Sequence, residues 1–175
     1  MRRAVAVLAL AAALVACNGP SNETRIDLTA YLARTKAWAP VEAEAARTVV
    51  RIFDTQFVNE AEVMRQIGDS RPRVLAHVAE LRDYHPRSQE VAHVHTRYIE
   101  AWQTLLDGYD AIEKGFSTGD YTNLARGRQD LDAWRDTIVD VARELRDLMQ
   151  HFGVDANGTV ESRAWPPDHS PTQRT

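Results

Sequence analysis

The sequence predicts an all-α protein, an antiparallel bundle of about four helices with a short extra helix at the start. Apolar residues recur at steps of three and four through residues 28–152, and no segment alternates as a half-buried strand would. Hydrophobic residues make up 44% of the 175 residues and there is one cysteine, which excludes a disordered chain and a disulfide scaffold. A single helical domain is therefore expected.

Prolines and glycines divide the first half of this domain. A short helix is expected over residues 28–37, closed by Pro40, and a second helix over residues 40–67, stopped by Gly68. The third begins at residue 69 and is broken by Tyr84-His85-Pro86. The expected core stripe of the second helix is Ala46, Val50, Phe53, Phe57, Ala61, Met64 and Ile67, widened by Val49 and Ile52. The expected stripe of the third helix is Leu75, Val78 and Leu81.

Two long heptad patterns fill the second half. The first, over residues 88–116, is Val91, His95, Tyr98, Trp102, Leu105, Tyr109, Ile112 and Phe116. The second, over residues 120–152, is Leu124, Gly127, Leu131, Trp134, Ile138, Val141, Leu145, Leu148 and Phe152. The short link predicts an antiparallel hairpin, capped by Asp120 or Thr118, with the Tyr109 ring against the Gly127 backbone.

The start of the chain resembles the signal peptide of bacterial lipoproteins. Arg2 and Arg3 precede thirteen apolar residues, 4–16, which are too few to span a bilayer but suit a secretory signal. Leu14-Val15-Ala16-Cys17 then resembles the lipobox. That resemblance implies diacylglycerol on the Cys17 thiol, cleavage before Cys17 and acylation of the new amino terminus.

The resemblance also implies a division of the chain and a location in the cell. The expected divisions are a signal peptide (1–16), lipidated Cys17 with a tether (17–27), a bundle (28–152) and a disordered tail (153–175). The protein is expected to be lipid-anchored in the cell envelope, its partners being membrane lipid and an envelope protein. Asn18 replaces the Asp that retains enteric lipoproteins at the inner membrane, which favours the outer membrane in a Gram-negative source.

No pattern of residues predicts catalysis or nucleic-acid binding. The chain lacks a Gly-rich phosphate loop, a Gly-x-Ser-x-Gly elbow and a His-Glu-x-x-His helix. Its formal net charge is -4, and the arginines form no basic block. We therefore expect a non-catalytic binding or scaffolding domain without a cofactor.

The alternative function is binding of a metal or a small ligand. Glu90 and His93 have the Glu-x-x-His spacing of carboxylate-bridged metal bundles, but no second such pair follows. His77, His85 and His95 cluster with them in sequence, which would suit zinc or copper if they converged. The favoured interpretation is that these histidines lie on the surface, except His95, which belongs to the seam.

Two further patterns have a functional and a structural interpretation. The aromatic ladder, which could line an apolar cleft but is favoured as plain core, is Tyr98, Trp102, Tyr109, Phe116 and Trp134. The acidic rail, which could meet a basic partner or divalent ions but is favoured as a solvated face, is Asp132, Asp136, Asp140 and Glu144.

Overall fold

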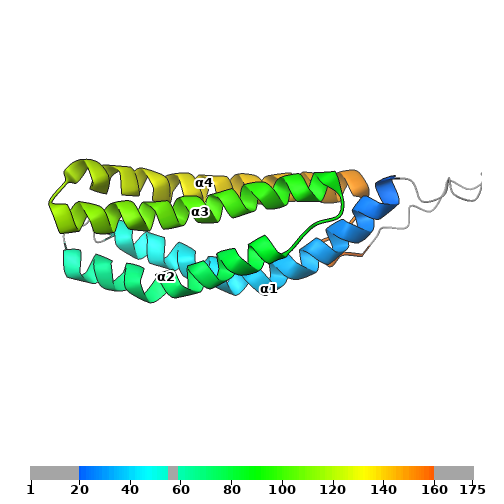
Figure 1. Cartoon of the computed structure of the whole chain (residues 1–175). Helices are drawn as coiled ribbons and strands as arrows, with labels where there is room; N and C mark the ends of the chain where they lie inside the picture. The colour runs from blue at the N-terminus through cyan, green and yellow to red at the C-terminus, as the bar shows by residue number, and fades with distance from the viewer. Residues whose placement is uncertain (1–19, 55–58, 160–175) are drawn as a thin grey trace, which may run out of the picture.

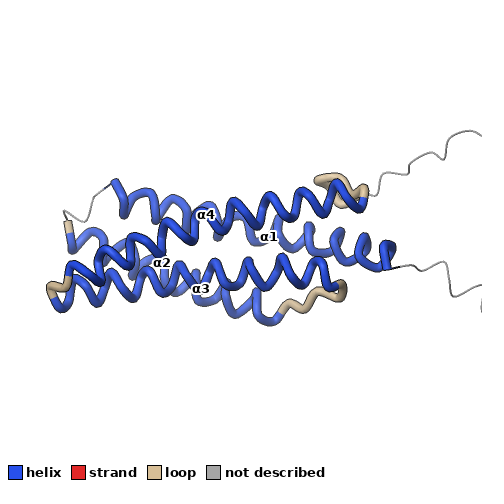
Figure 2. The backbone as a smooth tube through the Cα atoms, turned by 90° about the horizontal axis from the view of Figure 1, so that it is seen from above, coloured by secondary structure: helices blue, strands red, loops and turns tan. Residues whose placement is uncertain are grey.

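The computed structural model describes residues 20–54 and 59–159 and contains four helices (Figure 1). They are α1 (Pro20–Asp54), α2 (Glu60–Asp83), α3 (Gln89–Thr118) and α4 (Tyr121–Phe152). The helices lie side by side along one axis and form an elongated antiparallel bundle (Figures 1 and 2). The predicted all-α bundle is confirmed. The signal peptide and Cys17 lie outside the described residues.

The four helices do not contribute equally to the bundle. α3 and α4 share the most extensive contact, and α3 also packs against α2 and α1. In the described part of the chain the backbones of α2 and α4 do not approach each other, so these two helices are diagonal in the bundle. The start of α1, the α2–α3 connection and the end of α4 lie together (Figure 1). We call this region, residues 20–30, 84–88 and 152–159, the amino-terminal end of the bundle.

The prediction for the first part of the chain was wrong in two respects. α1 begins at Pro20, so residues 20–27 are helix and not tether, and Leu28 and Tyr31 are buried within it. Pro40 lies inside α1 and does not separate a short first helix from a second. Pro40 is exposed while the nearby Trp38 and Ala45 are buried, so packing on the opposite face holds the helix together despite the missing amide.

The first break in the helical chain comes later than predicted. α1 ends at Asp54 and α2 begins after Asn59, whose Oδ1 accepts the backbone N–H of Glu62 at 3.1 Å. α2 then continues through Gly68, the predicted stop. The predicted stripe was only partly right: Ala46 and Val50 are exposed, whereas Val49 and Ile52, expected only to widen it, are buried, as is Ile67.

The core positions of α2 also differ from the prediction. Leu75 was expected in the core but is 50% exposed, whereas Val78 and Leu81 are buried as expected. Val74 and His77 take the remaining core positions. α2 ends at Asp83, directly before the predicted break, and the following Tyr84 has the extended dihedrals φ -88° and ψ 128°.

The hairpin of α3 and α4 agrees with its prediction in extent, seam and caps. The predicted seam residues of α3 are buried from Val91 to Ile112. Gly119 has φ 68°, a left-handed conformation that glycine adopts without strain, and ends α3. The carboxylate of Asp120 accepts the backbone N–H of Thr122 at 2.8 Å and caps α4.

The hairpin contact at Gly127 differs from its prediction. A Cβ placed on Gly127 would lie 2.6 Å from Ile112 Cγ1 and 2.8 Å from the Gly108 carbonyl oxygen. Gly127 therefore meets Gly108 and Ile112, and the Tyr109 hydroxyl lies 3.2 Å from Ser70 Oγ on α2. Two facing glycines bring the helix backbones together, and the large ring is better accommodated between α3 and α2.

The first residues of the predicted tail are ordered. Gly153 ends α4 with φ 63°, and Val154 is 5% exposed. Residues 153–159 return to α1, where Thr29 Oγ1 donates a hydrogen bond to the Gly158 carbonyl oxygen at 3.2 Å. Arg25 Nε also donates to the Phe152 carbonyl oxygen at 2.7 Å. Residues 160–175 lie outside the described part of the chain.

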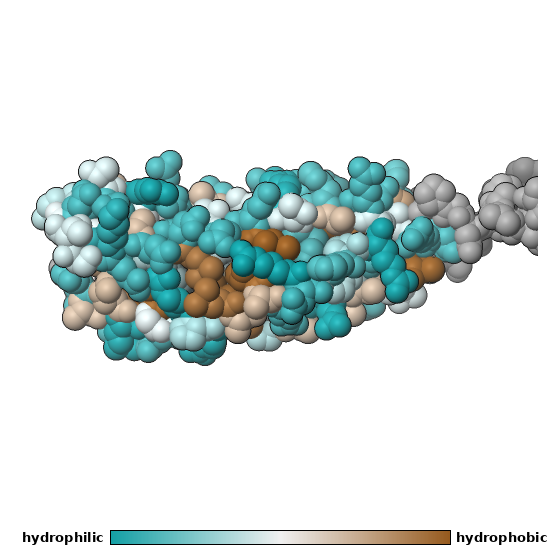
Figure 3. All heavy atoms as spheres, in the orientation of Figure 1, coloured by the Kyte–Doolittle hydropathy of each residue, from teal (hydrophilic) through white to brown (hydrophobic). Residues whose placement is uncertain are grey.

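The surface of the bundle is mostly hydrophilic. Figure 3 shows one face, on which apolar residues gather midway along the bundle, between α2 and α3. The large apolar side chains that remain exposed on the described helices are Ile26, Val50, Leu75, Tyr121 and Val139. Among the described helices none is both long and apolar enough to cross a membrane.

Candidate functional site

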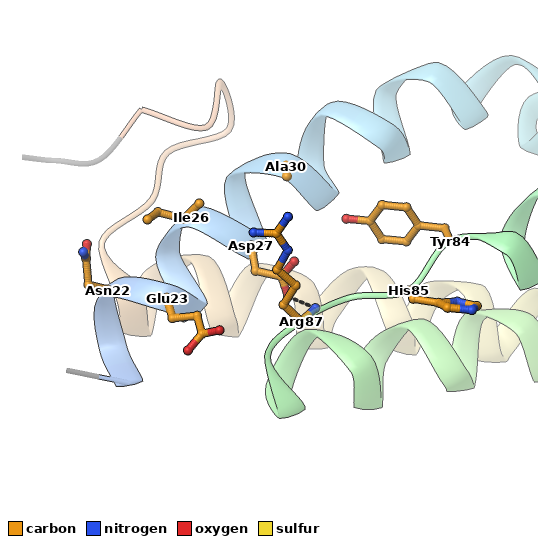
Figure 4. Close-up of a pocket in the computed structure, with 8 residues that line it drawn as sticks. All are labelled: Asn22, Glu23, Ile26, Asp27, Ala30, Tyr84, His85 and Arg87. Atoms are coloured by element: carbon orange, nitrogen blue, oxygen red, sulfur yellow. Dashed lines mark hydrogen bonds between the residues drawn. The ribbon is translucent and has the colours of Figure 1, made fainter. Parts of the chain in front are cut away.

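A cavity of about 560 Å³ opens at the amino-terminal end of the bundle. α1 forms one wall, and the α2–α3 connection forms the other (Figure 4). The lining residues are Asn22, Glu23, Ile26, Asp27, Ala30, Tyr84, His85 and Arg87. We call this cavity the end pocket. Its volume is in the range of roughly 300–1,000 Å³ that ligand sites occupy.

Asp27 fixes the geometry of the end pocket. It is only 5% exposed, and its Oδ2 accepts the backbone N–H groups of Arg87 and Ser88 at 2.9 and 2.8 Å. The Ser88 hydroxyl donates to the same oxygen at 2.8 Å. Ser88 precedes α3 and makes no side-chain cap bond of its own. One buried carboxylate thus ties α1 to the α2–α3 connection and presents a fixed negative charge in the pocket wall.

Tyr84 contributes the polar end of an aromatic ring. Its hydroxyl points from the α2–α3 connection toward α1 (Figure 4). Burial raises the pKa of this hydroxyl, and the charge of Asp27 raises it further, while Arg34 and Arg87 oppose that effect. The guanidinium carbon of Arg34 lies 5.8 Å from the centre of the Tyr84 ring. The hydroxyl therefore stays protonated at neutral pH and can donate a hydrogen bond into the pocket.

The remaining pocket residues give it mixed character. Glu23 and Arg87 are exposed and have opposite charges, and Ile26 is 61% exposed. His85, one of the metal candidates, also lies on the rim and is exposed. The end pocket combines acidic, basic, hydroxyl and apolar groups within one cavity.

Two candidate histidines are buried in an aromatic cluster where α1, α2 and α3 meet. His95, on α3, is fully used: Nε2 donates to the Leu81 carbonyl oxygen at 2.9 Å, and Nδ1 lies 3.3 Å from the Tyr31 hydroxyl, which donates to it. The expected surface position of His77 was wrong: His77, on α2, is 3% exposed, and neither ring nitrogen has a hydrogen-bond partner. Burial lowers the pKa of both imidazoles.

The aromatic ladder is core. The rings of Trp102 and Trp134 meet edge to face with centres 5.8 Å apart, and both residues are at most 2% exposed. The His77 ring lies 4.4 Å from that of Trp102. At the border of this cluster the Tyr98 hydroxyl donates to Glu42 Oε2 at 2.8 Å. The interlocked rings favour the core interpretation over a ligand cleft.

The five metal candidates do not converge. Glu90 and His93 line a groove of about 450 Å³ together with Glu144 and Asp147 of α4. His77 and His95 are buried in the aromatic cluster, and His85 lies at the end pocket. In residues 20–54 and 59–159, no group of three or more histidine, cysteine or acidic side chains is arranged to hold a metal ion.

The acidic rail on α4 is an ion-paired face. Arg135 lies 3.0 Å from Asp132 and 3.8 Å from Asp136. Arg143 pairs with Asp140 at 2.7 Å, and Glu144 pairs with Arg97 of α3. Most of these groups are exposed, so each pair contributes little to stability, but the three arginines offset most of the negative charge of the four acidic residues.

Sequence reasoning missed the main residues of the end pocket. Asp27 belonged to the expected tether, Tyr84 belonged to the expected break, and Arg87 lay between that break and the next predicted helix. The local signal that remained was Ser88 before an apolar run, typical of a helix start. That signal marks the beginning of α3 but does not reveal that an acid from α1 would satisfy it.

Comparison with known proteins gives no relative: no family model matches the chain, and no curated protein or solved structure is significantly similar to it.

Proposed function

We propose that this protein is an exported, lipid-anchored protein of the bacterial cell envelope, whose helical bundle acts as a non-catalytic binding or scaffolding domain. The observation that carries the proposal is Leu14-Val15-Ala16-Cys17 after a basic start and thirteen apolar residues. An acylated Cys17 would also account for the single cysteine of an exported chain.

The position of α1 supports this proposal. α1 begins at Pro20, three residues after Cys17, and three residues span at most about 11 Å. Acyl chains on Cys17 would therefore hold the amino-terminal end of the bundle close to the membrane. Each buried acyl CH₂ contributes about 0.8 kcal/mol, so two or more chains anchor the protein stably.

Two buried polar groups and the aromatic ladder have structural roles in the bundle. Asp27 and His95 are engaged in structural hydrogen bonds, and the aromatic ladder is closely packed. The available surfaces are therefore the end pocket and the exterior of the helices, which suit membrane lipid and an envelope protein as partners. Asn18 favours the outer membrane in a Gram-negative source.

The test of anchoring is a Cys17→Ser variant expressed from the full-length gene. We expect the wild type in the membrane fraction with a lipid mass on its first residue, and the variant without that mass and released from the membrane. Ser21→Ala is the matched control and should fractionate as the wild type does. An unmodified Met1 in the wild type, or unchanged fractionation of Cys17→Ser, would contradict the proposal.

A further inference from the structure

We propose that the end pocket binds the zwitterionic headgroup of a phosphatidylethanolamine-type lipid from the membrane that anchors the protein. This inference rests on the proposed function, because the tether brings the pocket to that membrane. It assigns a ligand class to a cavity built from α1 and the α2–α3 connection.

The charges in the pocket match such a headgroup. Arg87 is exposed in the pocket and can pair with a lipid phosphate, and the Tyr84 hydroxyl can donate a second bond to it. The exposed Glu23 can pair with the ammonium group, and the buried carboxylate of Asp27, whose Oδ2 is occupied by hydrogen bonds, adds negative charge behind it. Figure 4 shows these side chains around one space, contributed by two elements far apart in sequence.

The mixed charge discriminates between lipid classes. An anionic phosphatidylglycerol headgroup would satisfy Arg87 but would face Glu23 and Asp27 without a cation. Inorganic phosphate would meet the same repulsion. A simple cation would be attracted by the acidic side chains but repelled by the guanidinium group of Arg87. Only a ligand with both charges complements both sides of the pocket.

The location of the pocket favours a lipid of the same membrane as its occupant. Its α1 residues lie between Asn22 and Ala30, two to ten residues after Pro20, which is about 3–15 Å along the helix. The polar headgroup layer of each leaflet is about 5–8 Å thick. With a link of about 11 Å at most, the pocket is within reach of this layer. The exposed Ile26 side chain on the rim can rest against the upper part of the acyl chains.

The experiment uses the lipidated protein purified from membranes in a mild detergent. Dihexanoyl phosphatidylethanolamine is titrated below its micellar concentration, and binding is followed by NMR shifts of the amides of residues 22–30 and 84–88. Dihexanoyl phosphatidylglycerol and inorganic phosphate are titrated in parallel. Arg87→Gln and Glu23→Gln test the pocket charges, and Arg47→Gln and Glu100→Gln are matched controls on exposed positions outside the pocket.

We expect saturable binding of the ethanolamine lipid, weakened about tenfold or more by each pocket variant and unchanged by each control. The glycerol lipid and phosphate should bind at least tenfold more weakly than the ethanolamine lipid. Equal binding of all three ligands, no saturable binding, or binding that both pocket variants leave unchanged would overturn the inference.

The result is separable from the test of anchoring. Mass spectrometry of the first residue of the same sample reports acylation independently of headgroup binding. An acylated protein without selective binding would overturn the inference and leave the anchor intact. An unacylated protein that binds selectively would contradict the anchor, and with it the membrane as the source of the lipid, while keeping the pocket assignment.

Discussion

His77 and His95 are buried in the same aromatic cluster but differ in their hydrogen bonding. His95 has a partner for each ring nitrogen, so its burial costs little. His77 has none and is surrounded by rings, with Trp38 and Trp102 among its neighbours. An unsatisfied buried imidazole costs free energy, roughly 1–3 kcal/mol for such a polar group. The burial of His77 therefore lowers the free energy of unfolding.

This arrangement predicts a pH-dependent stability. Burial lowers the pKa of His77, and Glu80 on the same helix offsets only part of that effect. The unfolded imidazole, with a pKa near 6.5, takes up protons that the folded one does not, so stability should fall as the pH drops below about 6.5. Above that pH both states are neutral, and the effect should vanish.

The variant that tests this prediction is His77→Leu, which removes the titrating group and its unsatisfied nitrogens. Urea unfolding between pH 8 and pH 5 should show a shallower loss of stability for His77→Leu, with a remainder from His95, whose pKa is also lowered. At pH 8 the variant should lie within about 1 kcal/mol of the wild type or above it. The exposed His93→Gln is the control. A slope equal to that of the wild type in His77→Leu would contradict the assignment.

At the scale of the elements, tertiary packing overrides local helix breakers. Pro40 and Gly68 both lie inside helices, although each is a strong local signal for an end. A glycine in a helix costs about 1 kcal/mol relative to alanine, and burial of a few neighbouring apolar side chains exceeds that cost. Ile67 and Val74, close to Gly68, are at most 1% exposed.

Two glycines in helices predict opposite effects of the same substitution. A Cβ at Gly127 would lie 2.6 Å from Ile112 and 2.8 Å from the Gly108 oxygen, so Gly127→Ala must push α3 and α4 apart. We expect a destabilisation of about 1–3 kcal/mol, even though alanine favours the helix. A Cβ at Gly68 would meet nothing within 4 Å, so Gly68→Ala should stabilise by about 0.5–1 kcal/mol.

Chemical denaturation of both variants measures these changes in the free energy of unfolding. Equal effects of the two substitutions would show that helix propensity alone decides both positions, and the close α3–α4 contact would then be wrong.

At the scale of the whole molecule, α3 makes the most extensive contacts with other helices, and the two ends of the bundle differ. α1 and α3 each pack against all three other helices, whereas the backbones of α2 and α4 do not approach each other in the described residues. One end carries the start of α1, the end pocket and the returning residues 153–159 (Figure 1). The opposite end carries the α3–α4 turn (Figure 1). A tether on the first end would leave the long sides and the opposite end available to a protein partner.

The extensive contacts of α3 predict the order of local opening. Amides of α3 between Tyr98 and Ile112, buried against several helices, should show the slowest hydrogen exchange. Amides near Asn59, at the exposed start of α2, should exchange fastest among the helical segments. Native-state exchange followed by mass spectrometry or NMR measures this order. Slower exchange in α1 than in α3 would contradict a bundle organised around α3.

How far the fold follows from local pattern differs between the two halves. The α3–α4 hairpin could be predicted in extent and caps because two uninterrupted heptad patterns meet at a short link. The α1–α2 half could not be predicted in this way. Pro40 and Gly68 are typical of helix ends but lie inside helices, and Trp38, a core residue, was not part of the predicted stripe. The end pocket depends on Asp27 reaching Ser88, 61 residues away, and no periodic signal encodes that contact.

The sequence by itself determined the helical class, the α3–α4 seam and the expectation of a lipid anchor at Cys17, because periodicity, short links and signal motifs are local properties. Only the tertiary structure decided where α1 and α2 divide, which histidines are buried and how α1 meets the α2–α3 connection. These outcomes depend on which surfaces are covered by other helices, and the free energy of burial is gained only when distant segments come together.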